Sequence, residues 1–337
     1  MSRLIGVYGI LVLLFTFGCK EEAPPNDGTF SNQIRLNQIG YYPDALKKAV
    51  VVTESEISNF RIIESNSGET VFSGEISGPF IWELAGDQVG IADFSELTKE
   101  GSYQVYIEEL GYSFPFEIKD HVLLPVFHGS IKALYYQRAG MALEGKYASK
   151  WKRAMGHPDD SVIFHPSSGK KTGFLKSPKG WYDAGDYNKY VVNASFPLGQ
   201  YFLLEEQYPK CVADGNLNIP ESGNDISDYL DELKYEMDWV LTMQDEDGGL
   251  FHKLTTKNFE GMVMPHEATN QRYIVGKGTA ASLDFAGAAA QAARVFMPYD
   301  SIYAKRCLQA AKKAYSWSVE NPEVEFVNPE DITTGQY

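Results

Sequence analysis

The chain has 337 residues, of which 44% are hydrophobic and 13% aromatic, which is enough apolar material for a large core and more length than most single domains have. Acidic residues outnumber Lys and Arg by 45 to 30, and the formal net charge is −15. This balance excludes nucleic acid as an expected partner, because phosphate binding needs clustered basic side chains, whereas a neutral ligand such as a polysaccharide would not be repelled.

The first 19 residues have the layout of a bacterial lipoprotein signal peptide. Arg3 precedes an apolar run over residues 5–17, and the small residue Gly18 stands directly before Cys19. The run is too short to span a bilayer comfortably and is placed like the hydrophobic region of a signal peptide. The pattern predicts a lipid anchor on Cys19, although Thr16 stands where such signals prefer Leu.

Residues 20–33 are expected to be a flexible linker, because they contain paired prolines with Asn, Asp, Gly and Ser. Their start, Lys20-Glu21-Glu22, resembles the acidic export tag of surface lipoproteins of the Bacteroidetes. The expected location is therefore the cell envelope, on an outer-membrane lipoprotein exposed at the surface. The alternative is cleavage near Gly18 and secretion.

Residues 34–119 are predicted to form an antiparallel β-sandwich of immunoglobulin type. Short alternating or β-branched runs, separated by turn residues, occupy 49–53, 60–63, 70–72, 89–94, 103–107 and 112–118. No histidine cluster, acid pair or phosphate loop occurs in this domain, so it is interpreted as a packing module. Carbohydrate binding through Trp82 or through Tyr41-Tyr42 is the alternative.

Residues 120–337 form the second predicted domain, in which the apolar period changes from two to 3.6. Five amphipathic helices are expected, over 121–143, 189–208, 226–241, 279–297 and 301–319. Asn224 or Asp225 is the predicted N-cap of the third helix. Successive long helices favour a helical toroid or solenoid with function in its loops, and five would leave a toroid open. We therefore expect the sequence to be a fragment.

The most informative stretch is residues 180–190, Gly-Trp-Tyr-Asp-Ala-Gly-Asp-Tyr-Asn-Lys-Tyr. Asp183 and Asp186 lie on a turn that Gly185 permits, and two carboxylates at this spacing can converge on one water and raise its nucleophilicity. Trp181 and Tyr187 are among four aromatic residues that could contact sugar rings. Taken alone, the pattern leaves calcium binding or helix capping as open alternatives.

This stretch resembles the signature of glycoside hydrolase family 9, the inverting cellulases and related β-glucanases. Residues 34–41 resemble the start of the immunoglobulin-like module that precedes that catalytic domain. Further segments match the catalytic domain in the family's order: 219–224, 231–232, 243–244, 247–249, 263–265 and 331–335.

The resemblance implies an (α/α)6 barrel, incomplete in this chain, that hydrolyses β-1,4-glucosidic bonds of cellulose or related β-glucans with inversion. Asp186 would be the catalytic base, and Asp183 would help to hold the water. His266 and Arg272 follow a matching segment and are predicted to contact substrate, with a solvated or structural role as the alternative. The family's general acid is a glutamate late in the barrel, beyond this chain, which would by itself be inactive.

No cofactor is expected for the chemistry. Structural calcium is expected near Thr334-Gly335 or beyond. Zinc is not expected, because the loop with His157 and His165 contains no cysteine. Cys211 and Cys307 are predicted to be buried thiols.

A different function class stays open from the sequence alone. The absence of an assigned general acid would also fit a surface lipoprotein that binds glycan without hydrolysing it.

Overall fold

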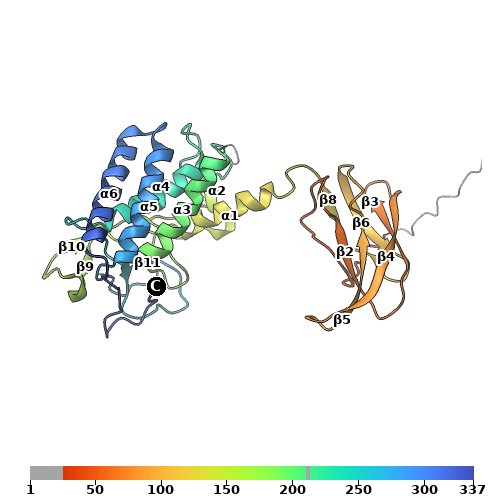
Figure 1. Cartoon of the computed structure of the whole chain (residues 1–337), viewed down its shortest axis with the longest axis horizontal. Helices are drawn as coiled ribbons and strands as arrows, with labels where there is room; N and C mark the ends of the chain where they lie inside the picture. The colour runs from red at the N-terminus through yellow and green to blue at the C-terminus, as the bar shows by residue number, and fades with distance from the viewer. Residues whose placement is uncertain (1–25, 210–212) are drawn as a thin grey trace, which may run out of the picture. The chain divides into compact units, whose positions relative to one another are not determined.

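A computed structural model describes residues 26–209 and 213–337. The chain divides into two compact units between Pro125 and Val126, each described here by itself (Figure 1). The predicted signal peptide with Cys19, and Cys211, lie outside the described residues, so lipidation stays a prediction. Every helix within the described ranges is too short or too polar to cross a membrane.

The first unit is an antiparallel β-sandwich in which the long strand β4 belongs to both layers (Figure 1). The strands pair in the order β1-β2-β5-β4-β3-β6-β7, with β8 also on β6. Their bounds are β1 Ile34–Arg35, β2 Lys48–Val52, β3 Asn59–Glu64, β4 Thr70–Trp82, β5 Asp87–Asp93, β6 Gly101–Ile107, β7 Gly111–Tyr112 and β8 Phe116–Ile118.

The β-sandwich has strands at all the predicted positions, with two differences. The strand predicted over 112–118 is two strands, β7 and β8, separated by residues 113–115, and β4 is longer than predicted. It was expected over 70–72 and instead continues to Trp82, because a register shift between Ser77 and Phe80 lets the strand pass Gly78-Pro79 and keep pairing with β5. The inward positions of the strands form one core, in which Val51, Ile62 and Val105 are fully buried.

The described part of the second unit contains five long helices, of which the first begins two residues before the division, and the single turn α2 Gly145–Ala148. The long helices are α1 Leu124–Gln137, α3 Val191–Gln207, α4 Asp228–Thr242, α5 Thr279–Phe296 and α6 Ser301–Glu320. α5 packs between α3 and α6, and its buried face is largely alanine, which allows close approach. Cys307 of α6 is fully buried, as predicted.

The predicted start of α4 was wrong. Its N-cap is Ser227, whose hydroxyl accepts from the Tyr229 amide at 3.2 Å. Asn224 instead caps its own turn by accepting from the Ile226 amide, and Asp225 has a φ of 67°, which a helix cannot continue.

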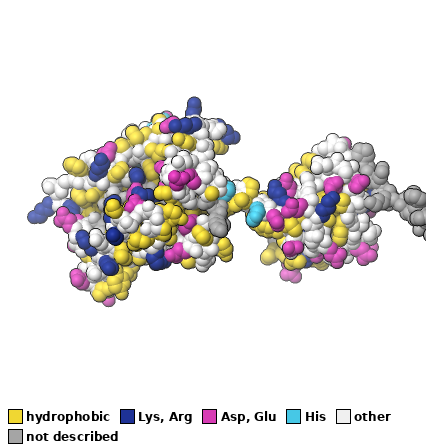
Figure 2. All heavy atoms as spheres, turned by 90° about the horizontal axis from the view of Figure 1, so that it is seen from above, with side chains coloured by type: hydrophobic (Ala, Val, Ile, Leu, Met, Phe, Trp, Pro, Cys, Tyr) yellow, Lys and Arg dark blue, Asp and Glu magenta, His cyan; other side chains and the backbone are white. Residues whose placement is uncertain are grey.

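On the face drawn in Figure 2, apolar side chains of this unit are exposed between scattered charges.

A small sheet joins the loops at one end of these helices. Its strands are β9 Val162–Phe164, β10 Phe174–Leu175, β11 Lys189–Tyr190, β12 Lys253–Thr255 and β13 Tyr273–Ile274, in the order β10-β9-β13-β12-β11. β11 runs directly into α3 and pairs antiparallel with β12, which places Tyr190 opposite Lys253. The sheet therefore anchors the turn at residues 183–187.

Candidate active site

The two predicted carboxylates lie on a tight turn just before β11. The Asp183 amide donates to the Asn188 carbonyl at 3.0 Å, and the Tyr187 amide donates to the Ala184 carbonyl at 3.3 Å. Tyr187 has a φ of 59°, a left-handed conformation that bulky residues rarely adopt, so the turn is shaped by its surroundings. The structure thus brings Asp183 and Asp186 to the same turn.

Asp186 has one oxygen that is fixed and one that is free. Its Oδ2 accepts from the Asn188 amide group at 2.9 Å and from the Tyr190 hydroxyl at 2.8 Å. Its Oδ1 is shielded from solvent and has no hydrogen-bond partner among the described residues. An oriented carboxylate with one unused oxygen is suited to accept a proton from a water.

Asp183 lies at the exposed surface of the turn, with a carboxyl that is partly shielded. Partial burial raises its pKa; the hydrogen bond from Asn193 Nδ2 to Oδ1, at 2.8 Å, acts against this, and the negative charge of Asp186 adds to the rise. Asn193 lies in the first turn of α3, so the helix holds Asp183 in place.

Trp181 is largely buried, with 9% of its surface exposed. Its indole N–H donates to Glu232 Oε1 at 2.8 Å, and its backbone amide donates to Glu236 Oε2. One side still lines a cavity of about 180 Å³ that Asp183 and Tyr190 also line. The predicted sugar contact of Trp181 stays a prediction. Its indole N–H is already used in the hydrogen bond to Glu232 and is not free to bind a sugar.

Beneath Trp181 lies a buried charge network. Arg138, fully buried on the segment after α1, contacts Glu232 of α4 at 2.9 Å and Glu221 at 3.0 Å. Burial raises the pKa of Glu236, also on α4, to about 8, so this carboxyl holds its proton at neutral pH. Through Trp181, these groups fix the segment that leads into the turn.

Tyr187 and Arg272 tie the turn to a neighbouring loop. The Tyr187 hydroxyl donates to the Val263 carbonyl. The backbone carbonyl of Tyr187 accepts from Arg272 Nη1 at 2.7 Å. Arg272 is only 6% exposed and pairs with Asp159 at 3.0 Å. Arg272 therefore supports the backbone of the turn, as in the structural role that was the alternative to substrate contact. Its predicted substrate contact stays a prediction.

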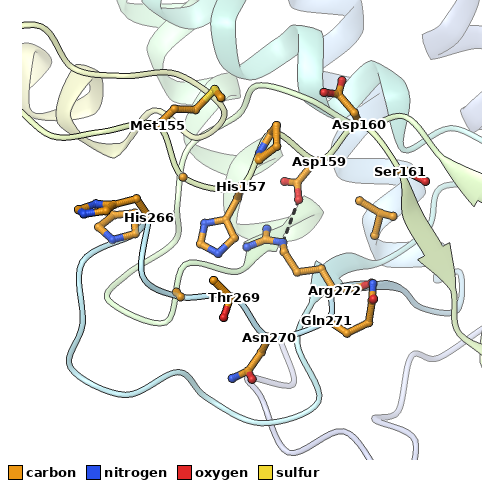
Figure 3. A pocket seen from close by; sticks show the side chains of 15 residues that line it. Met155, His157, Asp159, Asp160, Ser161, His266, Thr269, Asn270, Gln271 and Arg272 are labelled. Carbon is orange, nitrogen blue, oxygen red and sulfur yellow. Dashed lines mark hydrogen bonds and ion pairs between the residues drawn. The ribbon is translucent and has the colours of Figure 1, made fainter.

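His266 lies on the exposed wall of a cavity of about 500 Å³, which Figure 3 shows with His157, Asp159 and Arg272 at its inner side. The Nδ1 atom of His157 bonds the Tyr182 hydroxyl at 2.9 Å, and burial lowers the pKa of His157 to about 4. The imidazole is thus neutral at ordinary pH. The predicted substrate contact of His266 stays a prediction.

Across residues 26–209 and 213–337, no three His, Cys, Asp or Glu side chains converge as metal ligands would. The two histidines of the loop considered for zinc have different partners: His165 bonds Ser167 and Asp331, whereas His157 bonds Tyr182. Thr334 Oγ1 and the Gly335 carbonyl accept from the Lys253 ammonium at 3.1 and 2.6 Å. A cation already occupies these two oxygens, so they do not fit calcium, and calcium elsewhere near this end stays a prediction.

Sequence reasoning missed how four residues hold the site: Asn188, Tyr190, Asn193 and Lys253. Tyr190 was expected only as one of the four aromatic residues that could contact sugar rings. Asn188 and Tyr190 belong to the same stretch as the two aspartates, and Asn193 follows by one turn of helix, so these three could have been found. Lys253 comes to the site only through the pairing of β11 with β12.

Comparisons with known proteins agree with one another. A family profile described as Glycosyl hydrolase family 9 matches residues 125–337, and one described as Cellulase N-terminal ig-like domain matches residues 29–111. A xyloglucan-specific endo-beta-1,4-glucanase of Bacteroides ovatus is 41% identical over 336 residues, covering 96% of this chain and 55% of that protein. Endoglucanase D of Acetivibrio thermocellus is 38% identical over 311 residues, covering 91% and 49%.

A solved structure, Bacteroides ovatus GH9, superposes with a TM-score of 0.84 at 41% identity, covering 90% of this chain and 58% of that one. The chain therefore spans about half the length of the curated relatives it matches.

Proposed function

Because this chain belongs to glycosyl hydrolase family 9, we propose that the natural protein hydrolyses β-1,4-glucosidic bonds in a β-glucan with inversion. The observation that carries the proposal is the Asp186 carboxylate, with Oδ2 held by two donors and Oδ1 free of partners in the described structure. Helices α1 and α3–α6 would then form part of an (α/α)6 barrel.

In the proposed reaction, Asp186 Oδ1 takes a proton from a water while the water oxygen bonds to the anomeric carbon. The bond from that carbon to the glycosidic oxygen breaks, and the leaving oxygen takes a proton from a second carboxylic acid across the sugar ring. Asp183, held by Asn193, accepts the other proton of the water in a hydrogen bond. We assign no described residue as the general acid, and the chemistry needs no cofactor.

The proposed substrate is a β-1,4-glucan, and xyloglucan is the first to test because one relative is named as specific for it. Soluble xyloglucan, carboxymethyl cellulose and mixed-linkage glucan would be compared by release of reducing ends.

The same proposal includes membrane attachment through a lipid on Cys19, which fractionation of Cys19→Ser protein would test.

The decisive variant is Asp186→Asn, which keeps the shape of the side chain and removes the base. We expect kcat on the best glucan to fall by roughly 10²- to 10⁴-fold, with binding measured by calorimetry unchanged. Asp93→Asn, an exposed aspartate of the β-sandwich, is the matched control and should leave both unchanged. Full activity in Asp186→Asn would reject the base assignment.

A further inference from the structure

Lys253 is a buried cation beside the residue that holds Asp186. It begins β12 and lies directly opposite Tyr190 of β11, so the two side chains share one face of the sheet. The Tyr190 hydroxyl donates to Asp186 Oδ2. Lys253 itself is fully buried and does not line the cavity beside Asp183.

The ammonium group of Lys253 makes all three hydrogen bonds available to it. It donates to Asn328 Oδ1 at 2.8 Å, to Thr334 Oγ1 at 3.1 Å and to the Gly335 carbonyl at 2.6 Å. It also lies 5.3 Å from the ring centre of Tyr190. One side chain thus holds the segment 328–335 against the strand that carries Tyr190.

The charge of this ammonium has no carboxylate partner in contact, in contrast to the other buried lysine of the same sheet. Lys189 reaches Asp159 at 2.8 Å, whereas no ion pair of Lys253 occurs within the described ranges. Burial lowers the pKa of Lys253 to about 8, and the negative charge of Asp186 acts against that decrease. Asp186, likewise, has no cation in contact in the part of the chain described.

We propose that Lys253 is a positioning residue for Asp186, which holds residues 328–335 beside Tyr190 and supplies a positive charge near the base. The inference rests on the proposed function. Lys253 does not touch the reacting atoms: it acts through Tyr190 and through its field.

The other titratable groups around Asp186 come from three elements. Asp183 belongs to the same turn, Tyr190 to β11 and Tyr337 to the segment that follows Gly335. The Tyr337 ring packs edge-on against Tyr190 at 4.9 Å, and burial, with the charges of Asp183 and Asp186, raises the pKa of Tyr337. His252, the neighbour of Lys253, bonds the Tyr337 carbonyl at 2.9 Å. Burial lowers the pKa of His252 to about 4, so Lys253 is the member of this group that carries a positive charge at neutral pH.

The test compares Lys253→Met and Lys253→Arg in the full-length natural protein, with kcat/KM measured against pH on the best soluble glucan. If the two charges interact, removing the positive charge of Lys253 in Lys253→Met should move the acid limb of the profile to higher pH. Lys253→Arg keeps the charge but its planar fork cannot satisfy three clustered oxygens in the same way, so it should lower kcat and leave the limb in place.

Lys47→Met is the matched control. Lys47 is a fully buried lysine of the β-sandwich whose ammonium donates to the carbonyls of Pro43 and Ala45. This variant should leave the pH profile unchanged. A Lys253→Met profile that falls in height without moving along the pH axis would overturn the electrostatic role.

A second measurement decides the matter if Lys253→Met does not fold. By reciprocity, removing the charge of Asp186 must lower the pKa of Lys253 if the two interact. NMR titration of ¹³Cε-labelled lysine should show a lower pKa of Lys253 in Asp186→Asn than in the wild type, with the resonance assigned from Lys253→Arg. Equal values would reject the proposal. An inactive wild type would reject the proposed function and not the role of Lys253. The NMR titration would then still decide whether Lys253 and Asp186 interact.

Discussion

Asp186 differs from the other acids of the site in how its two oxygens are used. Tyr190 and Asn188 donate to one oxygen, and the other faces a position without a protein partner in the described structure. Burial raises the pKa of Tyr190, with the negative charge of Asp186 adding to it, so the phenol stays protonated and remains a donor at every working pH. The hydrogen bond therefore orients the carboxylate.

Tyr190→Phe removes this donor without changing the ring. We expect kcat to fall about 10-fold, which corresponds to about 1.4 kcal/mol, and KM to stay within about twofold, because the variant keeps the aromatic ring. The acid limb should also move to higher pH. Tyr229→Phe is the control, since that buried hydroxyl donates to the Tyr201 carbonyl at 2.8 Å and not to Asp186. Equal loss of activity in both variants would show that the effect is one of stability.

For single residues, the sequence predicted the two aspartates and the turn that carries them. It did not predict which partners the aromatic and basic side chains contact. Carboxylates at that spacing on a glycine-containing turn can converge on one water, and this possibility is visible in the local sequence. The direction of the Trp181 and Arg272 side chains depends on distant partners, Glu232 and Asp159, which no local pattern indicates. Both residues are largely buried: the Trp181 indole N–H donates to Glu232, and Arg272 contacts Asp159 and the Tyr187 carbonyl.

Among the elements, helix α3 carries a buried acid that neither the turn nor the sheet uses. Burial alone raises the pKa of Glu205 to about 7, and the side chain is 6% exposed. Between the ordinary glutamate pKa and this value, the folded protein holds a proton that the unfolded chain has lost. The folded state therefore binds more protons in that window, and stability must fall as pH rises through it.

Glu205→Gln should remove this pH dependence. The variant should match the wild type near pH 4, and above pH 7 it should be more stable by on the order of 2–3 kcal/mol. Urea unfolding at several pH values measures the difference. Glu206→Gln is the neighbouring control: hydrogen bonding to Arg294 lowers the Glu206 pKa, so its loss should slightly destabilise the protein above pH 4. A pH-independent difference for Glu205→Gln would contradict the assignment.

The five long helices were predictable because each carries an apolar stripe over three or more turns. The small sheet was not, because its strands have two or three residues and show no periodicity. The pairing of Tyr190 with Lys253 joins residues 63 positions apart by number, and it follows from the fold and not from either local sequence. The start of α4 was misplaced because three potential capping residues, Asn224, Asp225 and Ser227, occur close together.

For the molecule as a whole, the change of apolar period near residue 120 indicated a β-rich unit followed by a helical one. The structure divides the chain between Pro125 and Val126, and the two profile matches, over 29–111 and 125–337, agree with that division to within one residue on the helical side. The site described here belongs wholly to the second unit, in which the small sheet, α3 and residues 328–337 surround Asp186.

The central claim is that Asp186 activates water on one face of the sugar. The most direct measurement is the anomeric configuration of the first product, followed by ¹H NMR while the full-length natural protein cleaves a soluble β-1,4-glucan. Direct attack by water predicts that the new reducing end appears first as the α-anomer and then mutarotates. Initial appearance of the β-anomer would mean retention through a covalent intermediate and would contradict the role assigned to Asp186.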